Sequence, residues 1–139
     1  KPELAAEGVE YVDLDTLLAQ SDFVSLHVPM TPATAKMINA ESIAKMKDGA
    51  VLINCARGGV VDSEALAEAL NSGKLAAAGI DVFENEPPLA VEHPLLQAKN
   101  VVVTPHVAFA SKEALETRAD IVFANIDAFL SFFPQNIVK

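Results

Sequence analysis

Residues 50–73 have the sequence AVLINCARGGVVDSEALAEALNSG, and this stretch decides the fold class. Residues 50–54 form a nearly continuous apolar run, which predicts a strand with both faces buried. Two adjacent glycines then predict a loop. Asp62 or Ser63 predicts the N-cap of a helix that ends before Gly73. A buried strand followed by a loop and a helix is the repeating unit of a parallel α/β sheet.

The same alternation extends on both sides of this unit. Further strands are predicted at residues 10–13, 23–28, 77–82 and 101–104, with helices at 2–7, 14–20 and 40–47 and a proline-rich loop at 85–94. Ser111 predicts the cap of the longest helix. The apolar stripe of that helix is Leu115, Ala119, Val122, Ile126, Phe129 and Phe133. The fold class is therefore predicted to be α/β, with a doubly wound parallel sheet and helices on its flanks.

Composition excludes several classes of protein. Hydrophobic residues make up 51% of the 139 residues, as in globular domains. The net charge of −9 argues against nucleic acid as a partner. No apolar run approaches the roughly 20 residues of a membrane span. Cys55 is the single cysteine and cannot form an internal disulfide, which fits a reducing, cytoplasmic location.

Polar residues with useful chemistry follow the predicted strands, where ligand sites of such sheets lie. His106 can exchange a proton near neutral pH, and a carboxylate such as Glu86 can orient an imidazole. The guanidinium of Arg57 suits a carboxylate. Asp81 could accept a hydrogen bond from an amide or cap a turn. Each of these residues, taken alone, also has an ordinary structural interpretation.

Two kinds of site have no support in the sequence. The three histidines have no short-spaced metal-binding motif and Cys55 is solitary, so no metal site is predicted. The six glycines match neither GxGxxG nor the GxxxxGK[ST] loop, so no phosphate-binding loop is predicted either.

Four motifs together resemble those of the D-isomer-specific 2-hydroxyacid dehydrogenases. In chain order they are HVPMT at 27–31, VLINCARGGVVD at 51–62, GIDVFENEP at 79–87 and TPHVA at 104–108. The resemblance covers essentially the whole chain. It implies a cytoplasmic oxidoreductase that reversibly reduces a 2-oxoacid to a D-2-hydroxyacid with NAD, or alternatively NADP.

The resemblance also implies a role for individual residues. By position, Arg57 resembles the arginine that holds the substrate carboxylate and carbonyl. His106 resembles the general acid/base at the substrate oxygen, and Glu86 the carboxylate paired with it. The positions that resemble the nicotinamide site are Val28, Pro29, Cys55, Ala56, Arg57, Asp81, His106 and Ala108.

Family members are more than twice as long as this chain and carry GxGxxG and a substrate domain. Residues 1–139 therefore resemble only the second half of the NAD-binding domain, that is, half of a Rossmann-type sheet. We expect the isolated chain to be inactive, to bind NAD weakly or not at all, and to form a homo-oligomer. Two alternatives remain open. One is a non-catalytic module that self-associates through an open sheet edge. The other is an NAD-sensing, corepressor-like member of the family.

Overall fold

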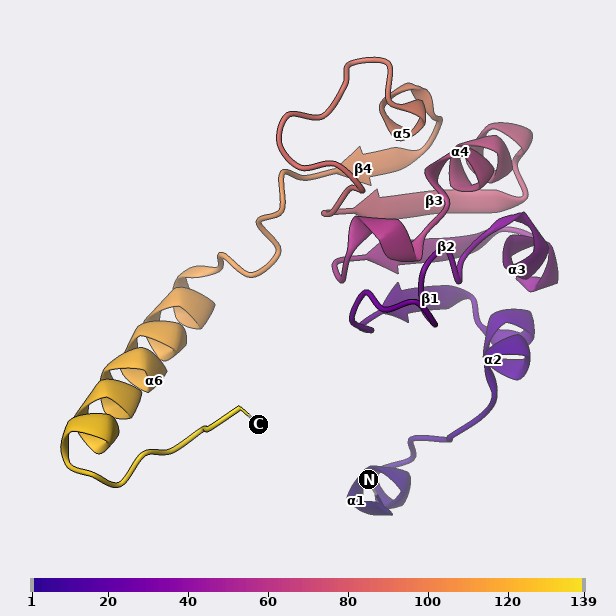
Figure 1. The fold of residues 1–139 in the computed structure, drawn as a ribbon. Coiled ribbons are helices and arrows are strands. Elements are labelled where there is room, and N and C mark those ends of the chain that lie inside the picture. The colour runs from indigo at the N-terminus through magenta and orange to yellow at the C-terminus, as the bar shows by residue number, and fades with distance from the viewer. Residues whose placement is uncertain (1, 139) are drawn as a thin grey trace. The chain divides into compact units, whose positions relative to one another are not determined.

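A computed structural model describes residues 2–138, and two compact units divide the chain after Pro105. The first unit is a sheet flanked by helices (Figure 1). Its elements are α1 (Pro2–Ala6), α2 (Leu14–Gln20), β1 (Phe23–Leu26), α3 (Ala40–Lys45), β2 (Ala50–Asn54), the 3₁₀ turn η1 (Gly58–Val60), α4 (Ser63–Ser72), β3 (Leu75–Ile80), α5 (Pro94–Gln97) and β4 (Val101–Val103). The second unit contains α6 (Lys112–Leu130).

The sheet is parallel, and its strands are ordered β1-β2-β3-β4 (Figure 1). Each strand therefore lies beside its neighbour in sequence, and α3, α4 and α5 lie in the three connections. Parallel crossovers are almost always right-handed, so connections that advance in one direction keep their helices on one face. This is the α/β fold class predicted from the sequence, in the form of half a Rossmann-type sheet.

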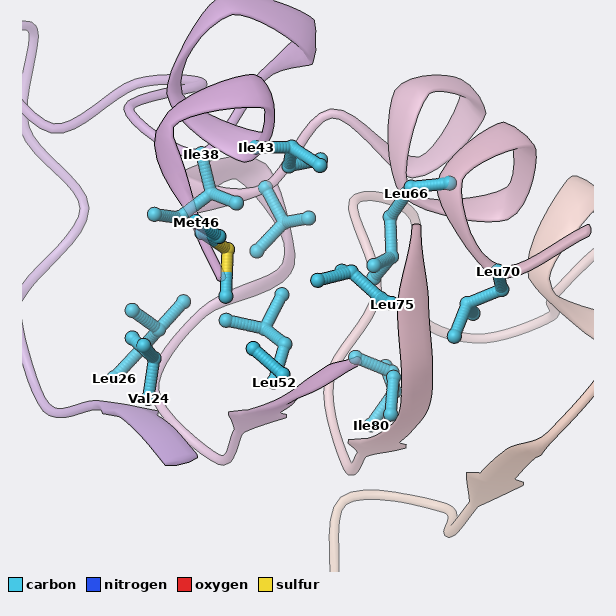
Figure 2. Packing of buried hydrophobic residues seen from close by; sticks show 14 of the residues in the cluster. Val24, Leu26, Ile38, Ile43, Met46, Leu52, Leu66, Leu70, Leu75 and Ile80 are labelled. Atoms are coloured by element: carbon cyan, nitrogen blue, oxygen red, sulfur yellow. The ribbon is translucent and has the colours of Figure 1, made fainter. Parts of the chain in front are cut away.

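The hydrophobic core lies between that face of the sheet and the helices (Figure 2). Alternate strand residues point into it, because side chains of a strand alternate between faces. The buried strand residues on this face include Val24, Leu26, Leu52, Ala78 and Ile80. The helices and loops contribute Ile38, Ile43, Met46, Leu66 and Leu70.

The prediction that the strands are buried on both faces is wrong for the first unit. Phe23 is 70% exposed and Val102 69% exposed, and Val51 and Ile53 are only half-buried. All of these residues lie on the face opposite to the core. An apolar run predicts a strand, but it does not show how many faces of the sheet are covered. Here the strand order advances in one direction, so the connecting helices of the unit cover one face.

Local signals at the centre of the chain predict the elements well. The strand at 50–54 is confirmed, and Asp62 caps α4, whose C-cap Gly73 has a φ of 82°. The predicted strand at 77–82 lies two residues earlier, at Leu75–Ile80. The predicted loop at 85–94 is confirmed except at its last residue, Pro94, where α5 begins.

The predicted strand at residues 10–13 is wrong. The structure has irregular backbone there, and Asp13 instead caps α2. Its Oδ1 accepts the Thr16 N–H at 2.9 Å, and its Oδ2 accepts the Thr16 hydroxyl at 2.8 Å. These bonds lower the pKa of Asp13 below its usual value of 3.8. A capping carboxylate therefore ends the segment that the sequence pattern assigned to a strand.

The second unit is built around α6, which Ser111 caps as predicted. The helix ends at Leu130, so Phe133 of the predicted apolar stripe lies beyond it. None of the residues of α6 is buried, although its stripe includes Ile126 and Phe129. The residues from 106 to 138 thus form a helix without a core of their own.

Candidate functional site

The polar residues singled out in the sequence follow the carboxyl ends of the strands. All four strands run in the same direction, so these ends meet at one edge of the sheet (Figure 1). Residues 27–30 follow β1, residues 55–57 follow β2, and residues 81–86 follow β3. The first unit thus gathers these three groups at one edge, as the strand-end rule predicts.

Buried Asn54 fixes the loop after β2. Its side-chain oxygen accepts the Ala56 N–H and its amide donates to the Arg57 carbonyl, both at 3.0 Å. Its own carbonyl accepts the Asp81 N–H at 3.0 Å, which joins the ends of β2 and β3. An asparagine side chain that bonds the backbone two or three residues ahead closes a tight turn. Asn54 therefore sets the backbone from which the next three side chains project.

Arg57 follows this turn with an exposed side chain. Its backbone is extended, and Nη1 donates to the Ala56 carbonyl at 2.6 Å. The adjacent Gly58 is buried against the loop after β3: a Cβ there would lie 1.9 Å from the Phe83 carbonyl carbon. Only glycine permits this approach, so the loop that carries Arg57 is packed directly on residues 83–84.

A cleft of about 560 Å³ opens between the loops after β1 and β2. Its lining residues are His27, Val28, Pro29, Met30, Cys55, Ala56 and Arg57. Five of the residues predicted to form the site therefore lie together. The volume is in the usual range for a small-molecule pocket, and one cation at a partly apolar wall is a common arrangement in such pockets.

Asp81 follows β3 and is buried, with 3% of its surface exposed. The Thr104 hydroxyl donates to Oδ1 at 2.5 Å, and the Thr104 N–H donates to the Ile80 carbonyl at 3.0 Å. The carboxylate therefore joins the ends of β3 and β4. The observed donor is a hydroxyl, so this bond is neither of the two roles that the sequence left open.

Glu86 closes the turn after β3. Its Oε1 accepts the Phe83 N–H, so its carboxylate folds back over residues 83–86. The side chain is exposed, and the Phe83 N–H is not its only partner. Glu86 is thereby held at the same edge of the sheet as Arg57.

His106 and Ala108 belong to the second unit, so the pairing of His106 with Glu86 stays a prediction. His106 has a φ of 56°, in the left-handed region that costs an L-residue roughly 1 kcal/mol. Its ring meets the Phe109 ring edge-on, with centroids 6.3 Å apart. Arg118 lies 5.7 Å from the centroid of Phe109. Backbone strain at a histidine is a feature that clusters at functional sites.

Three further contributors had no role assigned from the sequence. His27 and Met30 line the cleft, and the His27 ring bonds the Ser25 hydroxyl at 2.9 Å. Asn54 sets the turn before Arg57. Its signal was a polar residue at the buried end of an apolar strand.

The structure gives two further findings about residues 2–138. No helix in this range is long and apolar enough to cross a membrane. Within the same range, no cluster of histidine, cysteine or acidic side chains has the arrangement of a metal site.

The comparison with known families decides the relationship. Residues 1–108 match the family model described as D-isomer specific 2-hydroxyacid dehydrogenase, NAD binding domain. The chain belongs to this family. Its relatives include a hydroxypyruvate reductase from Blautia hydrogenotrophica, 47% identical over 138 residues, a match that covers 99% of this chain and 42% of that enzyme.

Solved structures support the same relationship. The D-lactate dehydrogenase from Aquifex aeolicus, solved with NAD and lactic acid, is 37% identical with a TM-score of 0.81. That match covers 96% of this chain and 44% of the other. An acyclic imino acid reductase in complex with NADPH and D-Arg is 32% identical with a TM-score of 0.85, covering 96% and 42%. The chain thus spans about two fifths of the length of its relatives, which include proteins that bind NAD and NADPH.

Proposed function

We propose that this chain supplies the second half of the NAD-binding domain of an enzyme that reversibly reduces a 2-oxoacid to a D-2-hydroxyacid. The observation that carries this proposal is the placement of Arg57. An exposed guanidinium stands at the wall of the cleft after β1 and β2, on a loop that Asn54 and Gly58 hold in place. A fixed cation beside a partly apolar pocket suits a small carboxylic acid.

Arg57 would bind the carboxylate of the substrate. The planar guanidinium can donate two parallel hydrogen bonds to a carboxylate, which fixes the orientation of the acid as well as its position. It would also donate to the 2-oxo oxygen, where negative charge develops during reduction. Because the loop is closed by Asn54 before any ligand binds, little reorganisation is required.

His106 would act as the general acid/base. Reduction of a ketone needs a proton at the developing alkoxide, and an imidazole can supply one near neutral pH and take it back in the reverse direction. Glu86 would accept from the other ring nitrogen and stabilise the charged imidazole, as a carboxylate does for a catalytic histidine. The left-handed backbone of His106 supports an assignment to the site.

The lining of the cleft fits the nicotinamide half of a cofactor. When bound, that group supplies the hydride. Val28, Pro29 and Ala56 offer apolar surface to a flat ring, with Cys55 as a further neighbour. A place for Ala108 beside the ring is implied by the family resemblance alone. The Asp81 carboxylate would orient the carboxamide. The sequence contains no GxGxxG motif, so the proposal for these residues concerns the nicotinamide portion of the cofactor alone.

Site-directed variants of the intact enzyme that contains this chain test the proposal. We expect Arg57→Ala to lower kcat/KM for 2-oxoacids by roughly 100- to 1,000-fold, because a donor to the developing charge is lost. Arg57→Lys should retain only part of the wild-type kcat/KM, because lysine cannot form a bidentate hydrogen bond with the carboxylate. His106→Asn should lower kcat by roughly 100-fold or more. Steady-state loss of NADH absorbance with pyruvate, glyoxylate and hydroxypyruvate is the measurement.

Lys99→Ala is the matched control, because it removes a positive charge from an exposed residue of the same unit. It should leave the rates unchanged. Near-wild-type turnover by Arg57→Ala would refute the role of this residue. An intact protein that binds NAD in calorimetry but reduces none of the acids would instead favour the NAD-sensing alternative.

A further inference from the structure

Residues 83–84 touch both of the loops that carry catalytic residues of the proposed enzyme. Gly58, next to Arg57, packs on the backbone of Phe83 and Glu84 so closely that a Cβ would lie 2.4 Å from the Glu84 nitrogen. The Phe83 N–H donates to Glu86 Oε1. The same dipeptide therefore lies against the neighbour of one catalytic residue and is hydrogen-bonded to the other.

The Glu84 side chain anchors this dipeptide to two helices. Its Oε1 accepts the hydroxyl of buried Ser63, the first residue of α4. Its Oε2 lies 3.3 Å from His93 Nε2, and His93 caps α5. The Glu84 and His93 side chains are only 30% and 13% exposed. A carboxylate whose two oxygens bond two different partners, one of them the buried Ser63, is held more firmly than an exposed ion pair.

The His93 ring is oriented so that its Nε2–H can donate a hydrogen bond to Glu84. Its Nδ1 accepts the Leu95 N–H at 3.3 Å, which leaves Nε2 to carry the proton and donate to Glu84. The Phe83 ring packs on it edge to face, with centroids 5.2 Å apart. Both residues of the dipeptide thus contact His93.

We propose that Glu84 is a positioning residue that couples the loop of Arg57 to the turn of Glu86 through the anchored dipeptide 83–84. This inference rests on the proposed function, because it assumes the roles proposed there for Arg57 and Glu86. Glu84 touches no reacting atom in this role. It acts by holding the surface on which Gly58 packs and from which Phe83 donates to Glu86. A displacement of about 1 Å at a reacting group can cost roughly 100-fold in rate. Loss of a residue that holds such a group in place can therefore lower the rate strongly.

Glu84→Ala in the intact enzyme is the first test. We expect kcat/KM for the 2-oxoacid to fall roughly 10- to 100-fold, while KM for NADH stays within about twofold. Hydrogen exchange followed by mass spectrometry should show faster exchange in the peptides that cover residues 55–60 and 83–87 together. Glu92→Ala is the control, since Glu92 is exposed, carries the same charge and makes no hydrogen bond or ion pair among the described residues. It should change neither readout.

Two conservative variants separate the contacts of Glu84. Glu84→Gln keeps an oxygen for the Ser63 hydroxyl but turns an N–H toward the His93 N–H, so its rate should lie between wild type and Glu84→Ala. His93→Asn keeps the cap of α5, because asparagine is a good N-cap, but is too short to reach Glu84. It should reproduce the effect of Glu84→Gln without loss of the helix.

A glycine pair tests the coupling from the other side. Gly58→Ala should speed exchange in both peptides and lower the rate, because its Cβ would overlap the Phe83 backbone. Gly59→Ala should not speed exchange at residues 83–87, since its Cβ would meet the flexible end of the Met30 side chain, at 3.0 and 3.2 Å, and not the backbone of residues 83–84. If Gly58→Ala fails to fold, the Glu84 series decides alone.

The outcomes separate the two proposals. The coupling is overturned if Arg57→Ala is inactive but Glu84→Ala retains wild-type turnover. It is also overturned if exchange in Glu84→Ala rises only at residues 83–87. Wild-type turnover by both Arg57→Ala and Glu86→Gln would refute the proposed function itself.

Discussion

Residues 2–105 and residues 106–138 both carry apolar side chains at helical spacing, but only the first unit buries them. In the first unit, Leu66 and Leu70 of α4 lie against the sheet with almost no exposed surface. In the second, Ile126 and Phe129 of α6 are 49% and 70% exposed. An amphipathic pattern thus predicts a helix in both places, while burial depends on what the rest of the molecule offers to that helix.

This difference extends to the proposed site. Arg57 and Glu86 lie on loops attached to a packed core, where Asn54, Gly58 and Glu84 hold the backbone. His106 lies on the unit that lacks a core and has a strained backbone. The loop that carries Arg57 is therefore fixed by the fold of its own unit. Among residues 106–138, by contrast, no hydrophobic side chain is buried.

The largest effect is expected from a truncation in the core. Leu52→Ala should lower the free energy of unfolding of the chain by about 2–5 kcal/mol, because Leu52 is fully buried on the central strand β2. Ile126→Ala on α6 should change it by no more than about 0.5 kcal/mol. Urea denaturation followed by circular dichroism measures both. An equal loss in the two variants would mean that α6 is buried in solution, and dependence on protein concentration would identify a second copy as its cover.

Local chemistry explains why parts of the fold could be predicted from the sequence. The bounds of α4 follow from Asp62 and Gly73, which act within one turn of the helix. The strand at 10–13 was predicted wrongly because Asp13 has a capping role that competes with the strand pattern. One-sided burial of the sheet could not be predicted, since it depends on the direction of successive crossovers.

The site shows the same division between local and distant effects. Arg57 was predicted because a strand end is visible in the sequence. The role of Asn54 was missed, although a polar residue ending an apolar strand is a local signal. Glu84 could not be found at all, because its partners Ser63 and His93 lie 21 and 9 residues away.

A smaller effect is expected from the turn that carries Arg57. Asn54→Ala leaves the Ala56 N–H and the Arg57 carbonyl without their partner and should cost about 1–3 kcal/mol. Exchange of the Ala56 amide should become faster. Asn71→Ala is the matched control, because exposed Asn71 bonds a single loop amide, the Lys99 N–H, at 3.0 Å. A loss as large in the control would show that burial of Asn54 adds nothing to the rigidity of the turn.

The smallest effect is a pH-dependent one at the start of α4. The Lys36 ammonium, 2.9 Å from Asp62, and then the Ala65 N–H hold the pKa of the Asp62 carboxyl below its usual value of 3.8. A carboxyl whose pKa is lower in the folded state than in the unfolded state stabilises the fold fully above the unfolded value. That contribution is lost as the pH falls through the folded pKa. The stability of the chain should therefore decline below about pH 4 partly through Asp62.

Asp62→Asn isolates the charge, because asparagine keeps the helix cap and removes only the ion pair. At pH 7 the variant should be less stable by about 0.5 kcal/mol, a typical value for a partly exposed pair. The difference should shrink as the pH falls from 7 through the folded pKa of Asp62, below which the wild-type carboxyl is protonated as well. Asp120→Asn on exposed α6 is the control, with no difference expected at either pH. If the difference in stability between the wild type and Asp62→Asn stayed constant across this range, the effect would come from packing and not from charge. Asp62 would then stabilise the start of α4 sterically.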